Sequence, residues 1–131
     1  MRTNATKAKL NGGEVVFGAI ISRHAPDLVE LFGALGYDFV MIDCEHGSHD
    51  YASVLEMVLA CEVSGVTPIV RLPVNRPDVI LRYLDRGTMG VHVPHVNTKD
   101  EAVAAVRAVQ FHPEGDRGVG GGRKWYGMST T

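Results

Sequence analysis

Short apolar segments alternate with amphipathic segments along most of the chain. The apolar segments are rich in β-branched side chains and show no strict polar alternation, which is typical of strands buried on both faces of a parallel sheet. The amphipathic segments carry apolar residues at helical spacing and are followed by turn residues, mostly glycine. The predicted strands are residues 15–21, 39–42, 67–72 and 90–94, and the predicted helices begin near residues 4, 26, 50, 75 and 98.

Residue types at the helix ends support these boundaries. Pro26 stands at a first helical turn, where a missing N–H costs little. Asp50 or Ser48 is predicted to cap the next long helix, and Asn97 or Thr98 the last one, with Glu101 completing a capping box. The residues predicted to face inward on that last helix are Ala102, Val103, Ala105, Val106 and Val109, and on the helix before it Val79, Ile80, Tyr83 and Leu84.

Strict alternation of strand and helix predicts an α/β fold with parallel strands and right-handed crossovers. Four consecutive βα units are half of a (β/α)8 TIM barrel, so we expect residues 1–131 to form a single partial barrel domain, with no clear element in the tail 123–131. An open four-stranded sheet is the alternative. A half-barrel has two unpaired sheet edges, which predicts self-association into a homo-oligomer.

The amino-acid composition argues against several classes of function but does not identify one. The chain has 13 Lys and Arg against 15 Asp and Glu, so its net charge of -2 gives no electrostatic case for nucleic acid or an anionic membrane. No apolar run approaches the roughly 20 residues that span a bilayer, and the first residues lack the apolar core of a signal peptide. Cys44 and Cys61 match neither a disulfide framework nor a zinc motif, so we expect buried thiols and a cytoplasmic location.

Candidate chemistry gathers where the second predicted strand ends. The apolar run 39–42 is followed by Asp43, Glu45 and His46, at the strand end where parallel α/β folds build their sites. Histidine is the usual group titrating near neutrality, and an aspartate three residues earlier is within reach to fix its tautomer. The hypothesis is that Asp43 orients His46, which carries the proton. The alternative is that these are ordinary polar residues at a strand end.

Arg71 ends the third predicted strand, so it is expected deep at the same rim. A buried guanidinium needs an anion, and a substrate carboxylate is a natural bidentate partner. The alternative is a salt bridge to Asp43 or Glu45. Asp43 and Glu45 also share a strand face, but two carboxylates without a third ligand are a weak metal signal. His92 and His95 fall on opposite strand faces, so joint chelation is not expected, and at least one should be packed.

The glycine cluster at residues 118–122 lacks the features of a dinucleotide fingerprint and of a P-loop. It is either a rim loop whose N–H groups and Arg117 approach an anion, or a linker.

Five segments together resemble the HpcH/HpaI aldolase/citrate lyase family. They are GYDFVMIDCEHG at 36–47, PIVRLP at 68–73, LDRG at 84–87, VPHV at 93–96 and PEGDRGVG at 113–120. The match runs in order from about residue 15 to about residue 122. The resemblance implies a class II, metal-dependent aldolase on a (β/α)8 barrel, which cleaves or forms a carbon–carbon bond between a 2-oxo acid, as a pyruvate enolate, and an aldehyde.

The resemblance also implies roles for individual residues. Carried over by position, His46 is the acid/base, Asp43 its partner, and Arg71 the ligand of the pyruvate carboxylate and carbonyl. Asp85 matches an aspartate that reaches the substrate near a subunit boundary. The implied divalent ion (Mg, Mn or Co) is held in the family by a Glu and an Asp of later strands. The metal ligands are therefore expected to lie outside this chain, which we interpret as the N-terminal half of a longer enzyme.

Two other functions remain open from the sequence. One is a non-catalytic half-barrel that self-associates or binds a partner through its open edges. The other is a related lyase acting on a coenzyme A thioester, although no basic patch for the nucleotide tail is evident.

Overall fold

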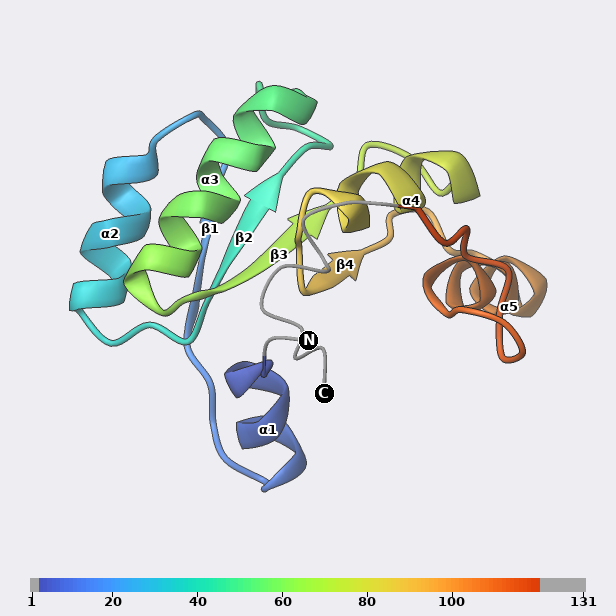
Figure 1. The fold of residues 1–131 in the computed structure, drawn as a ribbon, viewed down its shortest axis with the longest axis horizontal. Helices are drawn as coiled ribbons and strands as arrows, with labels where there is room; N and C mark the ends of the chain where they lie inside the picture. Colours follow the sequence, from blue (N-terminus) through green and yellow to red (C-terminus); the bar gives the residue numbers. More distant parts are fainter. Residues whose placement is uncertain (1–2, 121–131) are drawn as a thin grey trace.

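A four-stranded parallel sheet organises the computed structural model, which describes residues 3–120 (Figure 1). The strands pair in the order β1-β2-β3-β4, and all three pairings are parallel. The predicted α/β fold with four βα units is therefore confirmed, while the tail 123–131 lies outside the described residues. The strands are β1 (Gly18–Ile21), β2 (Phe39–Asp43), β3 (Thr67–Arg71) and β4 (Gly90–His92).

Helices separate consecutive strands and cover one face of the sheet. Sequential strand order with right-handed crossovers places every connecting helix on the same side, which is the winding of a barrel rather than of a doubly wound sheet. In Figure 1, α2 and α3 lie side by side over β1 and β2, and α4 and α5 follow toward β4. The helices are α1 (Ala5–Asn11), α2 (Pro26–Ala34), α3 (Tyr51–Ser64), α4 (Pro77–Asp85) and α5 (Lys99–Val109).

The hydrophobic core lies between the sheet and these helices. Val40, Ile42 and Val70 point from β2 and β3 toward the helices and are fully buried with Val54 and Val58 of α3. The other face of the sheet is different, since Ile20 of β1 is 61% exposed and Phe39 and Met41 of β2 are only half-buried. The expectation that strands 15–21 and 39–42 are buried on both faces is thus wrong, because no helix among residues 3–120 covers the second face.

The inward-facing residues of α4 are as predicted, and those of α5 only in part, since Ala105 is buried and Val109 packs against the core as predicted. Val79, Ile80, Tyr83 and Leu84 of α4 are all buried. In α5 the buried residues are Ala105 and Ala108, whereas Val103 and Val106 are exposed. The reason is that α5 packs on α4 through its small residues rather than lying against the sheet. The predicted capping box at Thr98 and Glu101 is confirmed, and Asp50 caps α3.

The N-terminal helix α1 covers the beginning of the sheet. Thr6 donates from its hydroxyl to the carbonyl of Asp38 and is 2.7 Å from the hydroxyl of Thr67, so α1 is tied to the starts of β2 and β3. Asn4 donates to the carbonyl of Met89, just before β4. The helix α1 therefore covers the N-terminal ends of the strands, and the polar side chains that follow the strands lie at the opposite end of the sheet. Among the described residues, no helix is long and apolar enough to cross a membrane.

Both cysteines are free and buried, as predicted. Burial is the main cause that raises the pKa of the Cys44 thiol to about 11 and that of Cys61 to about 12. Because only the thiolate is strongly nucleophilic, neither residue is a candidate nucleophile.

We expect Gly18→Ala to destabilise the fold by about 1–2 kcal/mol in urea unfolding, because overpacking displaces neighbouring atoms. Gly18 pairs with Phe39 across the strands, and a Cβ atom at Gly18 would overlap the Phe39 ring. Gly90→Ala is the matched control, since its Cβ would be 3.4 Å from the nearest side-chain atom of Ile69, an ordinary contact. Equal losses for the two variants would contradict this account.

Candidate active site

The carboxyl ends of β2 and β3 bring two charged residues together. The strand register places Asp43 beside Arg71, and Arg71 beside His92, so the last residues of three strands lie in a row. Backbone bonds extend this alignment, with Cys44 donating to the carbonyl of Arg71 at 2.9 Å and Leu72 to that of His92 at 3.0 Å. The predicted convergence of strand ends at one rim is confirmed for Asp43 and Arg71.

Asp43 and Arg71 form a bidentate ion pair. Arg71 donates through Nε to Oδ1 at 2.9 Å and through Nη2 to Oδ2 at 2.7 Å. The Asp43 side chain is 2% exposed and that of Arg71 is 22% exposed, so the aspartate is the buried partner. The hydrogen bonds from Arg71 are the main cause that holds the pKa of Asp43 far below its usual value, with help from the backbone N–H groups of His46 and Glu45. Asp43 is therefore a fixed negative charge.

Asp43 also shapes the turn that follows β2. Its Oδ1 accepts from the backbone N–H groups of Glu45 and His46, both at 3.1 Å, and Ser22 lies 3.4 Å from Oδ2. The predicted bond from Asp43 to the His46 ring is not what the structure shows. Asp43 binds the main chain of His46 and the guanidinium of Arg71, which matches the alternative salt bridge, because its oxygens are already occupied by these donors.

Gly47 lets this turn pass close to the neighbouring loop. A Cβ atom at Gly47 would overlap the carbonyl oxygens of Asp43 and Ser22. Ser48, the next residue, donates from its backbone to the Ser22 carbonyl at 3.0 Å. Main-chain atoms cannot move aside as a flexible side chain can, so a larger residue at position 47 would displace the turn that carries His46.

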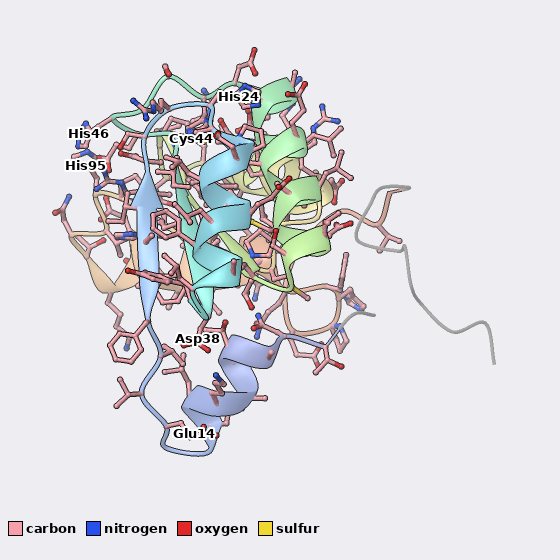
Figure 2. The ribbon with its side chains drawn as sticks, turned by 90° about the vertical axis from the view of Figure 1, so that its left-hand side faces the viewer. Glu14, His24, Asp38, Cys44, His46 and His95 are labelled. Carbon is pink, nitrogen blue, oxygen red and sulfur yellow. The ribbon has the colours of Figure 1, made fainter. Side chains whose placement is uncertain are left out.

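Glu45 links several groups that sequence reasoning had treated separately. Its side chain is 14% exposed, and its Oε2 lies 3.5 Å from Nε of Arg71. Its Oε1 lies 3.3 Å from Nε2 of His95, and its Oε2 lies 3.8 Å from Nε2 of His46. Figure 2 shows the His46 and His95 rings beside each other at the strand-end side of the sheet. The sequence predicts Glu45 as a weak metal ligand or as a salt-bridge partner of Arg71, and it gives no sign of the contacts with the two histidines.

His92 and His95 are both exposed, so the expectation that at least one is packed is wrong. His95 lies in the loop after β4 and reaches across β3 to a carboxylate from the loop after β2. Sequence spacing carries no signal for such a contact, because it depends on how the two loops fold back over the intervening strand.

Asp85 stands apart from the strand-end residues within this chain. It ends α4, the helix that returns the chain toward the start of β4, so it belongs to the opposite end of the sheet from Asp43 and Arg71. Arg117 donates to Asp85 at 3.2 Å and lies 4.7 Å from the centre of the Phe111 ring. The arginine of the predicted glycine loop thus pairs with an anion inside the chain, and residues 121–122 of that loop lie outside the described residues.

The described residues do not fit a divalent-ion site. Within residues 3–120 no group of three or more His, Cys, Asp or Glu side chains is placed to hold a metal. Both oxygens of Asp43 accept from Arg71, which removes one of the two carboxylates considered above.

Most of the chain is similar to known aldolases. A model of the HpcH/HpaI aldolase/citrate lyase family matches residues 17–128. A hydroxypyruvate/pyruvate aldolase from Roseobacter denitrificans is 38% identical over 117 residues, which are 89% of this chain and 46% of that protein. A 5-keto-4-deoxy-D-glucarate aldolase from Salmonella paratyphi A is 35% identical over 116 residues, 88% of this chain and 45% of that protein.

A solved structure shows the same fold. The crystal structure of an HpcH/HpaI aldolase from Desulfitobacterium hafniense DCB-2 matches with a TM-score of 0.82 and 32% identity, over 88% of this chain and 45% of that one. The chain therefore spans about half the length of the relatives it matches, in agreement with four βα units of a TIM-barrel-like aldolase.

We expect Asp43→Asn to destabilise the protein by about 3 kcal/mol in urea unfolding, because it leaves Arg71 without its buried partner. Asp78→Asn is the matched control. Asp78 forms the same bidentate geometry with Arg76, at 3.0 and 2.8 Å, but both side chains are exposed, so little change is expected. Similar losses in both variants would show that burial of the Asp43 pair does not matter.

The same pair predicts an acid dependence of stability. Because the pKa of Asp43 is lower in the folded than in the unfolded chain, its contribution is complete above about pH 5 and is lost as the pH falls toward the folded pKa. Urea unfolding measured from pH 7 down to pH 3 should show a smaller acid loss for Asp43→Asn than for the wild type. Parallel curves would contradict this prediction.

Proposed function

Because the chain belongs to the HpcH/HpaI aldolase/citrate lyase family, we propose that the cluster at the ends of β2 and β3 serves an aldol reaction of a 2-oxo acid. In the cleavage direction, a hydroxylated 2-oxo acid gives pyruvate and an aldehyde. The observation that carries the proposal is a guanidinium held rigidly at a strand end, with an exposed imidazole on the neighbouring turn.

Arg71 is the proposed ligand of the substrate's carboxylate and 2-oxo group. A guanidinium has five N–H donors, and the bonds to Asp43 use Nε and Nη2. Nη1 takes part in neither bond, and the side chain is 22% exposed, so Nη1 is the proposed donor to an incoming anion. Asp43 cannot protonate near neutral pH, so it holds the guanidinium in one orientation. A preorganised N–H donor also stabilises the oxygen of an enolate as charge develops there.

His46 is the proposed proton carrier. Its ring is 70% exposed, which leaves it accessible to a substrate bound at Arg71. Cleavage removes a proton from the hydroxyl group, breaks the carbon–carbon bond with its electron pair moving into the enolate, and returns a proton to the enolate carbon. An imidazole titrates near the pH at which such transfers are most efficient.

Metal dependence belongs to the proposal for the whole enzyme, as the family resemblance implies for Mg, Mn or Co. The described residues do not assemble the ligands, so a divalent ion used in the reaction needs ligands from outside residues 3–120. The role of Asp85 also stays a prediction, since it is paired with Arg117 in this chain.

A non-catalytic, self-associating half-barrel is the second candidate. The open sheet face presents Ile20, with Phe17 exposed just before it, and β1 and β4 each have one edge that pairs with no strand among the described residues. Exposed apolar residues beside an unpaired edge favour association.

Self-association would be detected by sedimentation velocity. We expect the wild-type chain to sediment as a concentration-dependent oligomer, and Ile20→Lys to shift the distribution toward monomer, because a charge would be buried at the contact. Val63→Lys, at an exposed position of α3, is the control. A wild-type chain that stays monomeric would exclude this candidate.

Retro-aldol cleavage of a 4-hydroxy-2-oxo acid, with Mg²⁺ present and pyruvate detected by a coupled assay, tests the first candidate. His46→Asn should lower kcat by about 10²–10⁴-fold, as expected for loss of a general acid/base. His24→Asn is the control, because His24 pairs with Glu56 of α3 at 2.9 Å and lies on the helix side in Figure 2. No pyruvate from the wild type, or full activity of His46→Asn, would refute the assignment for this chain.

A further inference from the structure

Glu45 is a nearly buried carboxylate that the reaction outlined above does not use. Its side chain is 14% exposed, while the two imidazoles that approach it, His46 and His95, are 70% and 78% exposed. Burying a carboxylate is unfavourable unless it is paired. Arg71 supplies part of the pairing at 3.5 Å, although its shorter bonds go to Asp43. Within residues 3–120, the other ion-pair contacts of the Glu45 side chain are with the two histidines.

The two imidazoles approach different oxygens of this carboxylate. Nε2 of His95 lies 3.3 Å from Oε1, and Nε2 of His46 lies 3.8 Å from Oε2, so both are ion-pair contacts. Both approach through Nε2. An ionised carboxylate only accepts, so a hydrogen carried on Nε2 of either ring would face Glu45 and would leave Nδ1 as the other nitrogen of the ring. Each Nδ1 is then the atom that can take up a proton.

The backbone of His95 is a second, independent observation. Its φ angle is 54°, a left-handed conformation that is unfavourable for a non-glycine residue. Such conformations persist where the surroundings hold them, and they are common at functional sites. Asn97 donates to the His95 carbonyl at 3.2 Å, and Glu101 accepts from the Asn97 backbone N–H at 2.7 Å, so the loop is fixed by the cap of α5. This loop conformation brings His95 to Glu45.

We propose that His95 is a second proton-transfer group of this site, and that Glu45 is the positioning residue that holds the His95 and His46 rings beside each other. The catalytic part of this inference rests on the proposed aldol reaction. Cleavage needs two proton transfers at different atoms. Nδ1 of a neutral His95 takes the hydroxyl proton while the carbon–carbon bond breaks and its electron pair enters the enolate. A protonated His46, charged beforehand from solvent, delivers a proton to the enolate carbon to form the methyl group, and His95 then returns its proton to solvent through its exposed side.

Two reactions of the full chain separate the roles of the two histidines. Exchange of the pyruvate methyl protons for deuterium needs only proton transfer at carbon, whereas retro-aldol cleavage needs both transfers. With Mg²⁺ present, His95→Asn should lower cleavage by about 10²-fold and leave methyl exchange within about threefold of the wild type. His46→Asn should lower both rates. A His95→Asn variant with unchanged cleavage, or with both rates lowered equally, would overturn the proposal.

The role of Glu45 has a readout that does not depend on activity. In low-temperature ¹H NMR, the His95 Nε2–H signal should be visible in the wild type, because the proposed contact of this N–H with a nearly buried carboxylate slows its exchange with water. Glu45→Leu should abolish that signal, and Glu56→Leu, which removes the exposed partner of His24, should leave it unchanged.

The NMR signal distinguishes failure of the proposed aldol function from failure of the proposed positioning role of Glu45. A wild type without cleavage or exchange refutes the proposed function and, with it, the catalytic role of His95, while the His95 signal still decides whether Glu45 holds the ring. A wild type that cleaves substrate but shows no such signal, or a signal that survives Glu45→Leu, overturns the positioning role of Glu45.

Discussion

The ion pair between Asp43 and Arg71 is the contact on which the rest of the site depends. It joins the last residues of two neighbouring strands, and the same carboxylate fixes the turn after β2 through the N–H groups of Glu45 and His46. Because the aspartate is buried and its pKa is held far below its usual value, it stays charged at neutral pH and holds the arginine by two hydrogen bonds. The turn beyond it, which Gly47 keeps close to Ser22, then determines where Glu45 and His46 lie.

The sheet has two unlike faces and two unlike ends, and this asymmetry explains where chemistry is possible. Helices bury one face, α1 covers the beginning of the strands, and the open face leads up to the strand ends that carry the charged residues. Apolar side chains such as Ile20 occupy that open face below the polar end. The charged strand ends and the apolar part of the same face are therefore separate surfaces of the sheet.

The spacing of hydrophobic and capping residues predicted the helices and strands well. It did not predict contacts between elements that are distant in the sequence. The capping box of Thr98 and Glu101 and the inner face of α4 depend on residues within one or two turns, so periodicity identified them. The one-sided burial of β2 and the exposure of Val106 depend on what packs against each element, which hydrophobicity alone does not specify.

The same limit applies to the site. The place of Asp43, His46 and Arg71 at the ends of predicted strands indicated that they share one rim, since consecutive parallel strands end on the same side of the sheet. It could not decide which group Asp43 would bind, and the observed partner is Arg71 rather than the His46 ring. The approach of His95 to Glu45 crosses an intervening strand, so no spacing rule predicts it. The catalytic roles themselves remain predictions.

Cys44 follows Asp43 directly and is buried with its thiol fully protonated at neutral pH, so a maleimide can modify it only when the chain around the ion pair opens. Cys61, within α3, is a second thiol of the same kind in the core. The protein thus carries two built-in reporters, whose relative labelling rates distinguish local fluctuation at the rim from opening of the whole molecule.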